Sequence, residues 1–333
     1  MGGDYAPLHE IQGALMAYKA FNNSNTPVEF IFVGREAVIR DILNKQNLDN
    51  GFHYSIVSAE EVITMEDEAA ISIRTKKNSS LISGIQLHKS GGADAFISAG
   101  NTGAVMTAAT LILGRIKGVS RPVIGSFFPT MKDQPTLVLD VGANAECKPK
   151  FLYEFAIMGS IYLREITGLK SPKIGLLNVG EERTKGNTLA LDAYHLLEQN
   201  PKLNFIGNVE GRDILAGSSD VVICDGFTGN IVLKFAESII TMLKSKIQSH
   251  AGKSILNKIA VAVMVPTLRK ILKEFDYQEY GGVPLLGVNG VVIIGHGKSS
   301  PLAIKNMLIR AVEIVEKQIN IRIEEELQTS TIE

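Results

Sequence analysis

The stretch from Ser98 to Ala104 has the composition of an anion-binding corner. It follows a short apolar run, Ala93 to Ile97, and precedes the helical pattern of Val105 to Leu113. A strand that turns into a helix leaves the first N–H groups of the helix unpaired, and such groups bind phosphate. The same pattern can also join a strand to a helix without binding anything. The substrate-binding residues expected here are Ser98, Gly100, Asn101, Thr102 and Gly103.

Four further expected strands end in similar corners of small and polar residues. These corners are Asp140 to Asn144, Asn178 to Asn187, Asp225 to Asn230, and Gly295 to Gly297. Ligands of doubly wound α/β proteins collect at the carboxyl ends of the strands. We therefore expect the five corners to meet at one edge of one sheet. The binding residues expected in the added corners are Asp140, Asn144, Asn178, Gly180, Asp225, Thr228 and Gly229.

Three side chains near these corners could carry charge or a proton to the site. Lys185 precedes an expected helix start, and Lys234 lies about two turns inside another helix, so both could neutralise a bound anion. A lysine at either position could equally remain a solvated surface charge. His296 lies between glycines in an exposed loop, which favours a functional histidine over a core one. Asp140 and Asp225 have an alternative use as caps of the adjacent turns.

Apolar runs alternate with helical patterns along the whole chain, which predicts an α/β fold with a doubly wound, mostly parallel sheet. We expect one domain over residues 1–328, a protruding helical pair at about 240–275 and a frayed tail at 329–333. The expected strands are Val28 to Val33, His53 to Val57, Ala93 to Ile97, Val123 to Phe128, Thr136 to Asp140, Lys173 to Val179, Leu203 to Gly207, Asp220 to Cys224 and Val291 to Ile294.

Composition excludes several classes of function. The 34 Lys and Arg residues nearly balance 35 Asp and Glu, and tryptophan is absent, so nucleic acid is not an expected partner. Two cysteines and no long apolar run predict a cytoplasmic protein without a disulfide framework. The sequence has no nucleotide phosphate loop, nucleophile elbow, dinucleotide fingerprint or zinc-ligand spacing. We therefore expect inorganic phosphate or a small phosphorylated compound, with no cofactor or metal.

Segments spread over the whole chain resemble those of bacterial phosphate acyltransferases of the PlsX type. They are Met1 to Asp4, Ser98 to Gly103, Gly114 to Lys117 with Arg121 and Pro122, Asp140 to Asn144, Leu177 to Gly180, Lys185 to Asn187, Asn204 to Glu210 and Asp225 to Asn230. The resemblance implies a fold similar to phosphotransacetylases and isocitrate dehydrogenases. It also implies a short apolar strand ahead of Met1, whose position would be a gap in the sheet of this chain.

The same resemblance implies that phosphate attacks the thioester of an acyl-[acyl carrier protein], giving acyl phosphate for a glycerol-3-phosphate acyltransferase in phospholipid synthesis. It implies a homodimer and a binding role for Asp4. Phosphate is itself the nucleophile, so the reaction needs an anion pocket and oxyanion donors. As catalytic residues we expect Lys185, Asn187 and Asn230, with His296 as proton donor to the leaving sulfur. A phosphotransacetylase-like enzyme using acyl-CoA and a non-catalytic phosphometabolite sensor remain as alternatives.

Two basic clusters could dock an acidic carrier protein. One contains Arg115, Lys117 and Arg121, and the other surrounds the apolar run Ile259 to Val265. A solvated helix face explains such clusters equally well. The apolar run predicts core or dimer contact, or else an acyl-chain groove or a peripheral contact of residues 255–270 with the inner face of the membrane. The second cluster consists of Lys253, Lys258, Arg269, Lys270 and Lys273.

Overall fold

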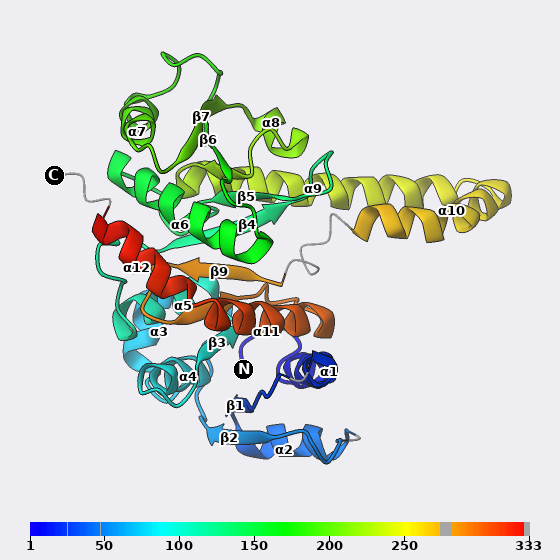
Figure 1. Ribbon diagram of the computed structural model, residues 1–333. Helices are drawn as coiled ribbons and strands as arrows, with labels where there is room; N and C mark the ends of the chain where they lie inside the picture. The colour runs from blue at the N-terminus through cyan, green and yellow to red at the C-terminus, as the bar shows by residue number, and fades with distance from the viewer. Residues whose placement is uncertain (25, 47, 274–280, 330–333) are drawn as a thin grey trace.

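The computed structural model describes residues 1–333 except 25, 47, 274–280 and 330–333 (Figure 1). It is an α/β structure, which confirms the expected class. The strands are β1 (Phe30–Gly34), β2 (Tyr54–Ser58), β3 (Ala95–Ser98), β4 (Val123–Phe128), β5 (Thr136–Leu139), β6 (Lys173–Leu177), β7 (Asn204–Val209), β8 (Val221–Ile223), β9 (Val283–Leu286) and β10 (Val291–Ile294).

Helices follow most of these strands, as the alternating pattern predicted. They are α1 (Leu8–Ser24), α2 (Glu36–Asn44), α3 (Ala69–Thr75), α4 (Ser80–Lys89), α5 (Thr102–Ile112), α6 (Pro149–Thr167), α7 (Thr188–Gln199), α8 (Gly211–Ala216), α9 (Gly226–Ala251), α10 (Ile255–Lys273), α11 (Pro301–Glu316) and α12 (Ile319–Thr329). The residue types Asn78, Ser79 and Ser80 predict a break and a new N-cap within the helical pattern of 66–87, and Ser79 is indeed the N-cap of α4: its hydroxyl accepts a hydrogen bond from the Ile82 N–H at 3.4 Å.

The main sheet has eight strands in the order β3-β10-β9-β4-β5-β8-β6-β7. It consists of two parallel blocks: β3 with β10, and β5 with β8, β6 and β7. Between the blocks, β9 is antiparallel to both β10 and β4, and β4 is antiparallel to β5. The two parallel blocks therefore run in opposite directions. β1 and β2 form a separate parallel two-stranded sheet.

Both faces of the main sheet are covered by helices. α6, α7, α11 and α12 contribute to the core on one face, whereas α4, α5, α8 and α9 contribute to the core on the other. Along β8, for example, Val221 and Ile223 belong to the first core and Val222 to the second. Strands buried on both faces read as continuous apolar runs, which is why these strands were recognisable in the sequence.

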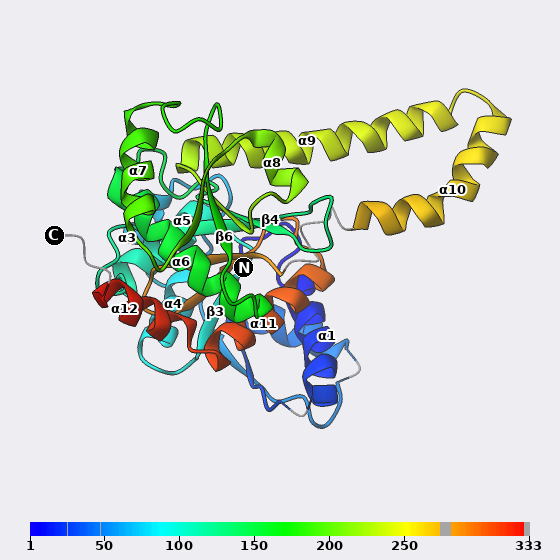
Figure 2. The same ribbon diagram turned by 45° about the horizontal axis from the view of Figure 1, so that its top comes forward.

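α9 and α10 project from the body as a helical pair (Figures 1 and 2). Along α9, the exposed apolar side chains include Phe227, Ile231, Phe235 and Ile239. On α10 they include Ile259 and Val263. Among the described residues, no helix combines the length and apolar character needed to cross a membrane. Most of the expected tail, residues 330–333, lies outside the described residues.

The remaining differences from the sequence prediction have local causes. The helical pattern from Leu302 to about Leu327 predicts one closing helix, but this segment divides at Gln318, which has a φ of 52°. β9 was not predicted, because its sequence Val-Pro-Leu-Leu contains a proline and shows no alternation. α8 was also missed, because its six residues are too few to show a helical repeat.

Candidate functional site

The corner between β3 and α5 is a strand-to-helix turn whose first residues are held by side-chain hydrogen bonds. Asn101 is the N-cap of α5, and its Oδ1 accepts a hydrogen bond from the Ala104 N–H at 3.0 Å. Ser98 Oγ accepts from the Gly100 N–H at 3.1 Å, which shapes the turn before the helix. The first N–H groups of a helix have no intrahelical acceptor, so those of Thr102 and Gly103 are available to a ligand.

Asn101 has a second, structural duty at this corner. Its Nδ2 donates to the carbonyl oxygens of Thr64, at 3.1 Å, and Asp67, at 3.0 Å. Asp67 in turn accepts a hydrogen bond from Lys76, and this ion pair lowers the pKa of the Asp67 carboxyl. Sequence reasoning missed this loop, because no motif marks residues that act only by supporting a neighbour. The Asn101 side chain thus caps α5 and supports the preceding loop.

Two more expected residues join the same corner. The Asp4 N–H donates to the Gly297 carbonyl at 2.8 Å, and the Gly295 N–H donates to the Ser98 carbonyl at 2.8 Å. His296 lies between these glycines with an exposed side chain. A Cβ on Gly297 would lie 3.1 Å from Asp4 Oδ1, which shows how closely the two loops approach. We call this set the β3 corner: Asp4, Ser98, Gly100, Asn101, Thr102, Gly103 and His296.

At the end of β5, Asp140 is fully buried and organises its own turn. Its Oδ1 accepts from the N–H groups of Gly142, at 3.1 Å, and Ala143, at 2.9 Å. Its Oδ2 accepts from the Asn144 N–H at 2.7 Å and from Asn144 Nδ2 at 2.8 Å. Burial raises the pKa of this carboxyl, against the lowering effect of these hydrogen bonds. The Asp140 carboxylate therefore caps its own turn, which is the alternative use that the sequence left open.

The start of α9 is packed directly against this turn. Asp225 caps α9, accepting from the Thr228 N–H and hydroxyl, each at 2.8 Å. The Gly226 N–H donates to the Asn144 carbonyl at 2.8 Å. A Cβ on Gly229 would lie 1.8 Å from the Asp140 carbonyl oxygen, so only glycine fits there. The side chains of Asp225 and Thr228 are therefore engaged with each other, as the capping alternative predicted.

Asn230 and Lys234 follow on α9 with exposed side chains. Asn230 lies beside Gly142, since a Cβ on that glycine would be 3.6 Å from the Asn230 side chain. Lys234 forms an ion pair with Glu237 at 2.9 Å, with 55% of the lysine side chain exposed. The structure thus places Asn230 at the β5 turn and gives Lys234 a partner on its own helix.

The loop after β6 brings the remaining expected residues together. Asn178 Nδ2 donates to the Lys185 carbonyl at 3.0 Å, and a Cβ on Gly180 would lie 3.1 Å from Lys185 Cγ. Asn187 caps α7, accepting from the Ala190 N–H at 2.9 Å. The Lys185 side chain is exposed. Because β5, β8 and β6 are parallel neighbours, their corners share one edge. We call this set the β5 edge: Asp140, Asn144, Asn178, Gly180, Lys185, Asn187, Asp225, Thr228, Gly229, Asn230 and Lys234.

The expectation that all five corners lie at one edge of the sheet is wrong. The β3 corner and the β5 edge lie at the carboxyl ends of blocks that run in opposite directions. Three strands separate β3 from β5, which at about 4.8 Å per strand spacing puts the two strands about 19 Å apart. The cause is the antiparallel pair β4 and β9. Without β9 in the prediction, this reversal could not be anticipated.

Neither cysteine has the properties of a nucleophile. Burial, together with the nearby Asp140 charge, raises the pKa of the Cys147 thiol to about 11. Burial also raises the pKa of the Cys224 thiol. Both groups are therefore protonated thiols at neutral pH, a form that attacks thioesters poorly. Among the described residues no cluster of His, Cys, Asp and Glu could hold a metal ion.

Comparisons with known proteins agree with this fold. A phosphotransacetylase from Streptococcus pyogenes superposes with a TM-score of 0.60 at 18% identity, covering 92% of this chain and 91% of that chain. EutD phosphotransacetylase from Staphylococcus aureus superposes with a TM-score of 0.59 at 17% identity, covering 92% of each chain. At these identities the likeness establishes the fold, and the expected similarity to phosphotransacetylases is confirmed.

Sequence comparisons establish the family. The phosphate acyltransferase of Dictyoglomus thermophilum is 46% identical over 331 residues, covering 99% of this chain and 97% of the relative. That of Halothermothrix orenii is 46% identical over 320 residues, covering 96% of this chain and 94% of the relative. The profile of the family described as fatty acid synthesis protein matches residues 1–322. The chain therefore belongs to the fatty acid synthesis protein family, among the phosphate acyltransferases, and is an acyltransferase enzyme.

Proposed function

We propose that this enzyme transfers an acyl group from acyl carrier protein to inorganic phosphate. Phosphate oxygen forms a bond to the thioester carbonyl carbon, the carbon–sulfur bond breaks, and the sulfur leaves as thiolate and takes a proton. The products are acyl phosphate and the free carrier thiol. Two observations support this reaction: relatives that are named phosphate acyltransferases, and protonated cysteine thiols, which would compete poorly with phosphate as nucleophiles.

The β3 corner is the proposed phosphate site. We choose it because the residue that caps its helix is uncharged. α5 is capped by the neutral amide of Asn101, whereas α9 is capped by the carboxylate of Asp225. A carboxylate at a helix N-terminus occupies N–H groups and adds negative charge, so it opposes phosphate binding. We therefore propose that the N–H groups of Thr102 and Gly103 hold phosphate, with Ser98 beside them. His296, on the adjoining loop, is the proposed proton donor to sulfur.

The β5 edge is the proposed second part of the site. Lys185, Asn187 and Asn230 keep their proposed catalytic roles as groups that stabilise the acyl donor's developing charge. Because that charge develops on the carbon that phosphate attacks, the corner and the edge must meet around the same thioester. Within one chain they end opposite-running strands, so we propose that the β5 edge of one protomer meets the β3 corner of its partner in the homodimer. α7 is also capped by a neutral residue, Asn187, and has Lys185 nearby, so its N-terminus is the rival phosphate site.

An exposed basic groove supports an acidic carrier protein as the donor. The groove has a volume of about 530 Å³, and its lining includes Leu111, Arg115, Arg121 and Phe151. Arg121 lies over the Phe151 ring at 6.0 Å from the ring centre. The adjacent Pro122 carbonyl accepts from Asn144 Nδ2 at 2.8 Å, so the groove adjoins the β5 edge. We propose that the carrier protein docks here through its acidic surface.

The α9–α10 extension is the proposed assembly surface. The apolar face of α9 is suited to a homodimer contact, because a row of side chains this apolar is otherwise left in water. The apolar residues of α10 and its lysines suit contact with an anionic membrane on the cytoplasmic side. The acyl phosphate would then be released near the membrane, where a glycerol-3-phosphate acyltransferase of phospholipid synthesis consumes it.

One assay tests the reaction and separates its alternatives. Thiol release from acyl carrier protein thioester and from acyl-CoA is measured with and without phosphate. We expect phosphate-dependent release, faster from the carrier thioester. A preference for acyl-CoA would favour the phosphotransacetylase-like alternative. Phosphate binding without thiol release from either donor would favour the sensor and contradict the proposal.

A further inference from the structure

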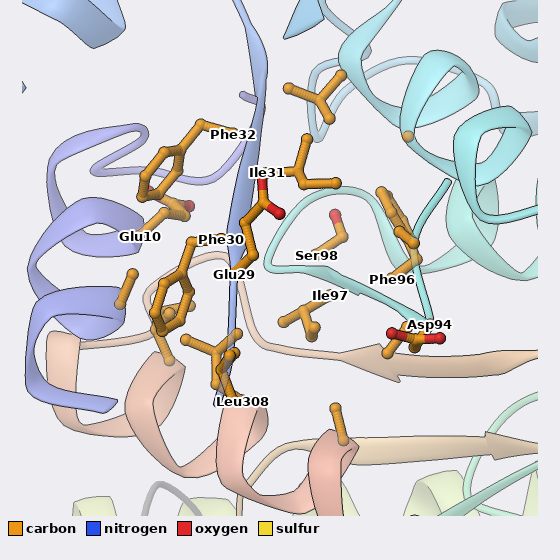
Figure 3. Close-up of a pocket in the computed structure, with 18 of the residues that line it drawn as sticks. Glu10, Glu29, Phe30, Ile31, Phe32, Asp94, Phe96, Ile97, Ser98 and Leu308 are labelled. Carbon is orange, nitrogen blue, oxygen red and sulfur yellow. The ribbon is translucent and has the colours of Figure 1, made fainter. Parts of the chain in front are cut away.

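Two hollows of the molecule differ in the charge of their lining. The cavity between β1 and β3, with a volume of about 470 Å³, has Glu10, Glu29 and Asp94 among its lining residues (Figure 3). The basic groove presents Arg115 and Arg121 instead. Opposite charges attract and like charges repel, so of the two hollows the groove has the charge to hold an acidic partner. How well it does so depends on where its two arginines are held.

Glu154 is a buried carboxylate beside this groove that the proposed reaction does not use. It lies on α6, and only 2% of the residue is exposed. Both of its carboxylate oxygens accept hydrogen bonds from Ser120: Oε2 accepts from the N–H and Oε1 from the hydroxyl, each at 2.7 Å. Hydrogen bonds to a charged acceptor are about twice as strong as those between neutral groups. One glutamate therefore fixes both the backbone and the side chain of one serine.

The surroundings of Glu154 oppose the cost of burying its charge. Burial raises the pKa of the Glu154 carboxyl, against the lowering effect of the Ser120 hydrogen bonds and of the Lys150 and Arg115 charges. A buried carboxylate without such contacts would be costly. The attraction is mutual, so the buried negative charge also draws these two cations toward Ser120.

Ser120 lies in the segment between α5 and β4, residues 113–122, which we call the α5–β4 loop. This loop supplies Arg115, Ser120 and Arg121 to the lining of the basic groove. The Ser120 carbonyl accepts a hydrogen bond from the Arg115 guanidinium, and Arg121 follows Ser120 in the chain. Both arginines of the groove are therefore connected directly to the serine that Glu154 holds.

The beginning of the α5–β4 loop has a separate anchor in the turn between β9 and β10. The Asn289 N–H donates to the Gly114 carbonyl at 3.0 Å, and Asn289 Nδ2 donates to the Arg115 carbonyl at 2.9 Å. These contacts do not involve Glu154. Loss of the Glu154 carboxylate should therefore loosen the end of the loop around Ser120 and leave its beginning in place.

We propose that Glu154 is a positioning residue for the basic groove: through Ser120 it orders the α5–β4 loop, so that Arg115 and Arg121 face an acidic partner together. This inference rests on the proposed docking of the carrier protein in the groove. A loop that is ordered before binding avoids the entropy cost of ordering on binding. Because Glu154 acts through Ser120 and not on the reacting atoms, its effect belongs to carrier binding and not to the chemical step.

Glu154→Gln tests this role with little change of shape. The glutamine side chain can accept only one of the two Ser120 hydrogen bonds, because its NH₂ group is a donor. In thiol-release assays with saturating phosphate, we expect KM for the carrier thioester to rise about fivefold or more and kcat to stay within about twofold. A lower kcat at unchanged KM, with a lower thermal unfolding temperature, would indicate a purely structural contact and would overturn the proposal.

A matched control lies on the same helix. Glu165, near the other end of α6, pairs with Arg164 and Arg322 and not with Ser120. We expect Glu165→Gln to keep the KM of the unaltered chain, and a rise equal to that of Glu154→Gln would contradict a specific role of Glu154.

A double variant tests whether Glu154 acts through Ser120. Ser120→Ala removes the hydroxyl that donates to Glu154 Oε1. If both residues act through one contact, combining Glu154→Gln with Ser120→Ala should raise KM little more than the stronger single change does. Increases in KM that multiply would contradict the proposed route. Circular dichroism checks folding, and Ser120→Ala carries the test if Glu154→Gln does not fold.

Hydrogen exchange separates the positioning role from docking of the carrier protein. Mass spectrometry follows amide exchange of residues 118–121 in the free enzyme. We expect exchange there to be about fivefold or more faster in Glu154→Gln than in Glu165→Gln. Equal exchange would overturn the proposal, and so would an unchanged KM in Glu154→Gln when Arg121→Glu raises KM. If Arg121→Glu also leaves KM unchanged, docking in the groove is itself wrong and the positioning role falls with it.

Discussion

Replacing Thr102 by proline tests whether the N-terminus of α5 holds phosphate. Thr102 is the first residue of α5, after the N-cap Asn101, whose ψ of 110° suits a residue before proline. Proline is favoured at this first helical position, where its missing N–H has no intrahelical partner. Thr102→Pro should therefore keep the helix while removing one N–H from the proposed phosphate site.

The expected effect follows from the charge of the ligand. A hydrogen bond to a charged group contributes about 1.5–3 kcal/mol, which corresponds to about a 10- to 150-fold change. We expect kcat/KM for phosphate to fall by that factor in steady-state thiol-release assays with saturating acyl donor. Thr102→Ala, which keeps the N–H and removes the hydroxyl, should have a smaller effect.

The same substitution on α7 provides the decisive control. Thr188 is the first residue of α7, after the N-cap Asn187, whose ψ is 174°. Thr188→Pro removes the equivalent N–H from the rival site, and thermal unfolding shows whether each variant keeps its structure. If Thr188→Pro lowers kcat/KM for phosphate and Thr102→Pro does not, phosphate binds at α7 and our choice of the β3 corner is refuted.

Four further predictions concern other parts of the molecule. The lowered pKa of Asp67 means that its ion pair with Lys76 stabilises the fold above the unfolded pKa of about 4, and that this stabilisation is lost as the pH falls through the lower folded pKa. Acid unfolding followed by circular dichroism should therefore show a smaller loss of stability in Lys76→Met than in the unaltered chain. An equal loss in both proteins would contradict this role of the ion pair. With a thiol pKa of about 11, Cys147 should react slowly with iodoacetamide at neutral pH. Rapid inactivation of the enzyme that is abolished in Cys147→Ser would contradict the conclusion that this thiol takes no part in catalysis. Arg121→Glu should raise KM for the carrier thioester about tenfold or more and leave acyl-CoA turnover unchanged, and an equal change for both donors would rule out docking in the groove. Val263→Asp should reduce flotation with anionic vesicles, and unchanged flotation would exclude α10 as the membrane contact.

Much of the fold was predictable because local signals agreed with the final structure. The apolar runs at Val123 to Phe128 and Val221 to Ile223 are buried on both faces, so their composition alone marked them as strands. Ser79 is a helix cap in the structure, as its residue type suggested. These features depend on neighbours in sequence or on burial, both of which leave a pattern in the chain.

The arrangement of the site was less predictable, because it depends on strand direction. Nothing in the corners themselves distinguishes Ser98 from Asp225, yet they end strands that run in opposite directions. That difference arises from β9, whose proline at position 284 hides it as a strand. Likewise, Asp140 looked like a ligand until its burial and its four hydrogen-bond donors were known. Tertiary contacts decided the strand direction, whereas the hydrogen bonds of Asp140 lie within four residues and correspond to the capping alternative.

The fusion of α9 to the β5 turn has a mechanical consequence. α9 is one uninterrupted helix of 26 residues, about 39 Å long, and its first turn contacts the Asp140 carbonyl with no room for even a methyl group. A helix of this length is stiff, and its first turn is fixed by close packing at the β5 edge, next to Asn144 and Asn230. If a bound surface or a second protomer tilted the far end of α9, the first turn of α9 would therefore change its angle at the β5 edge.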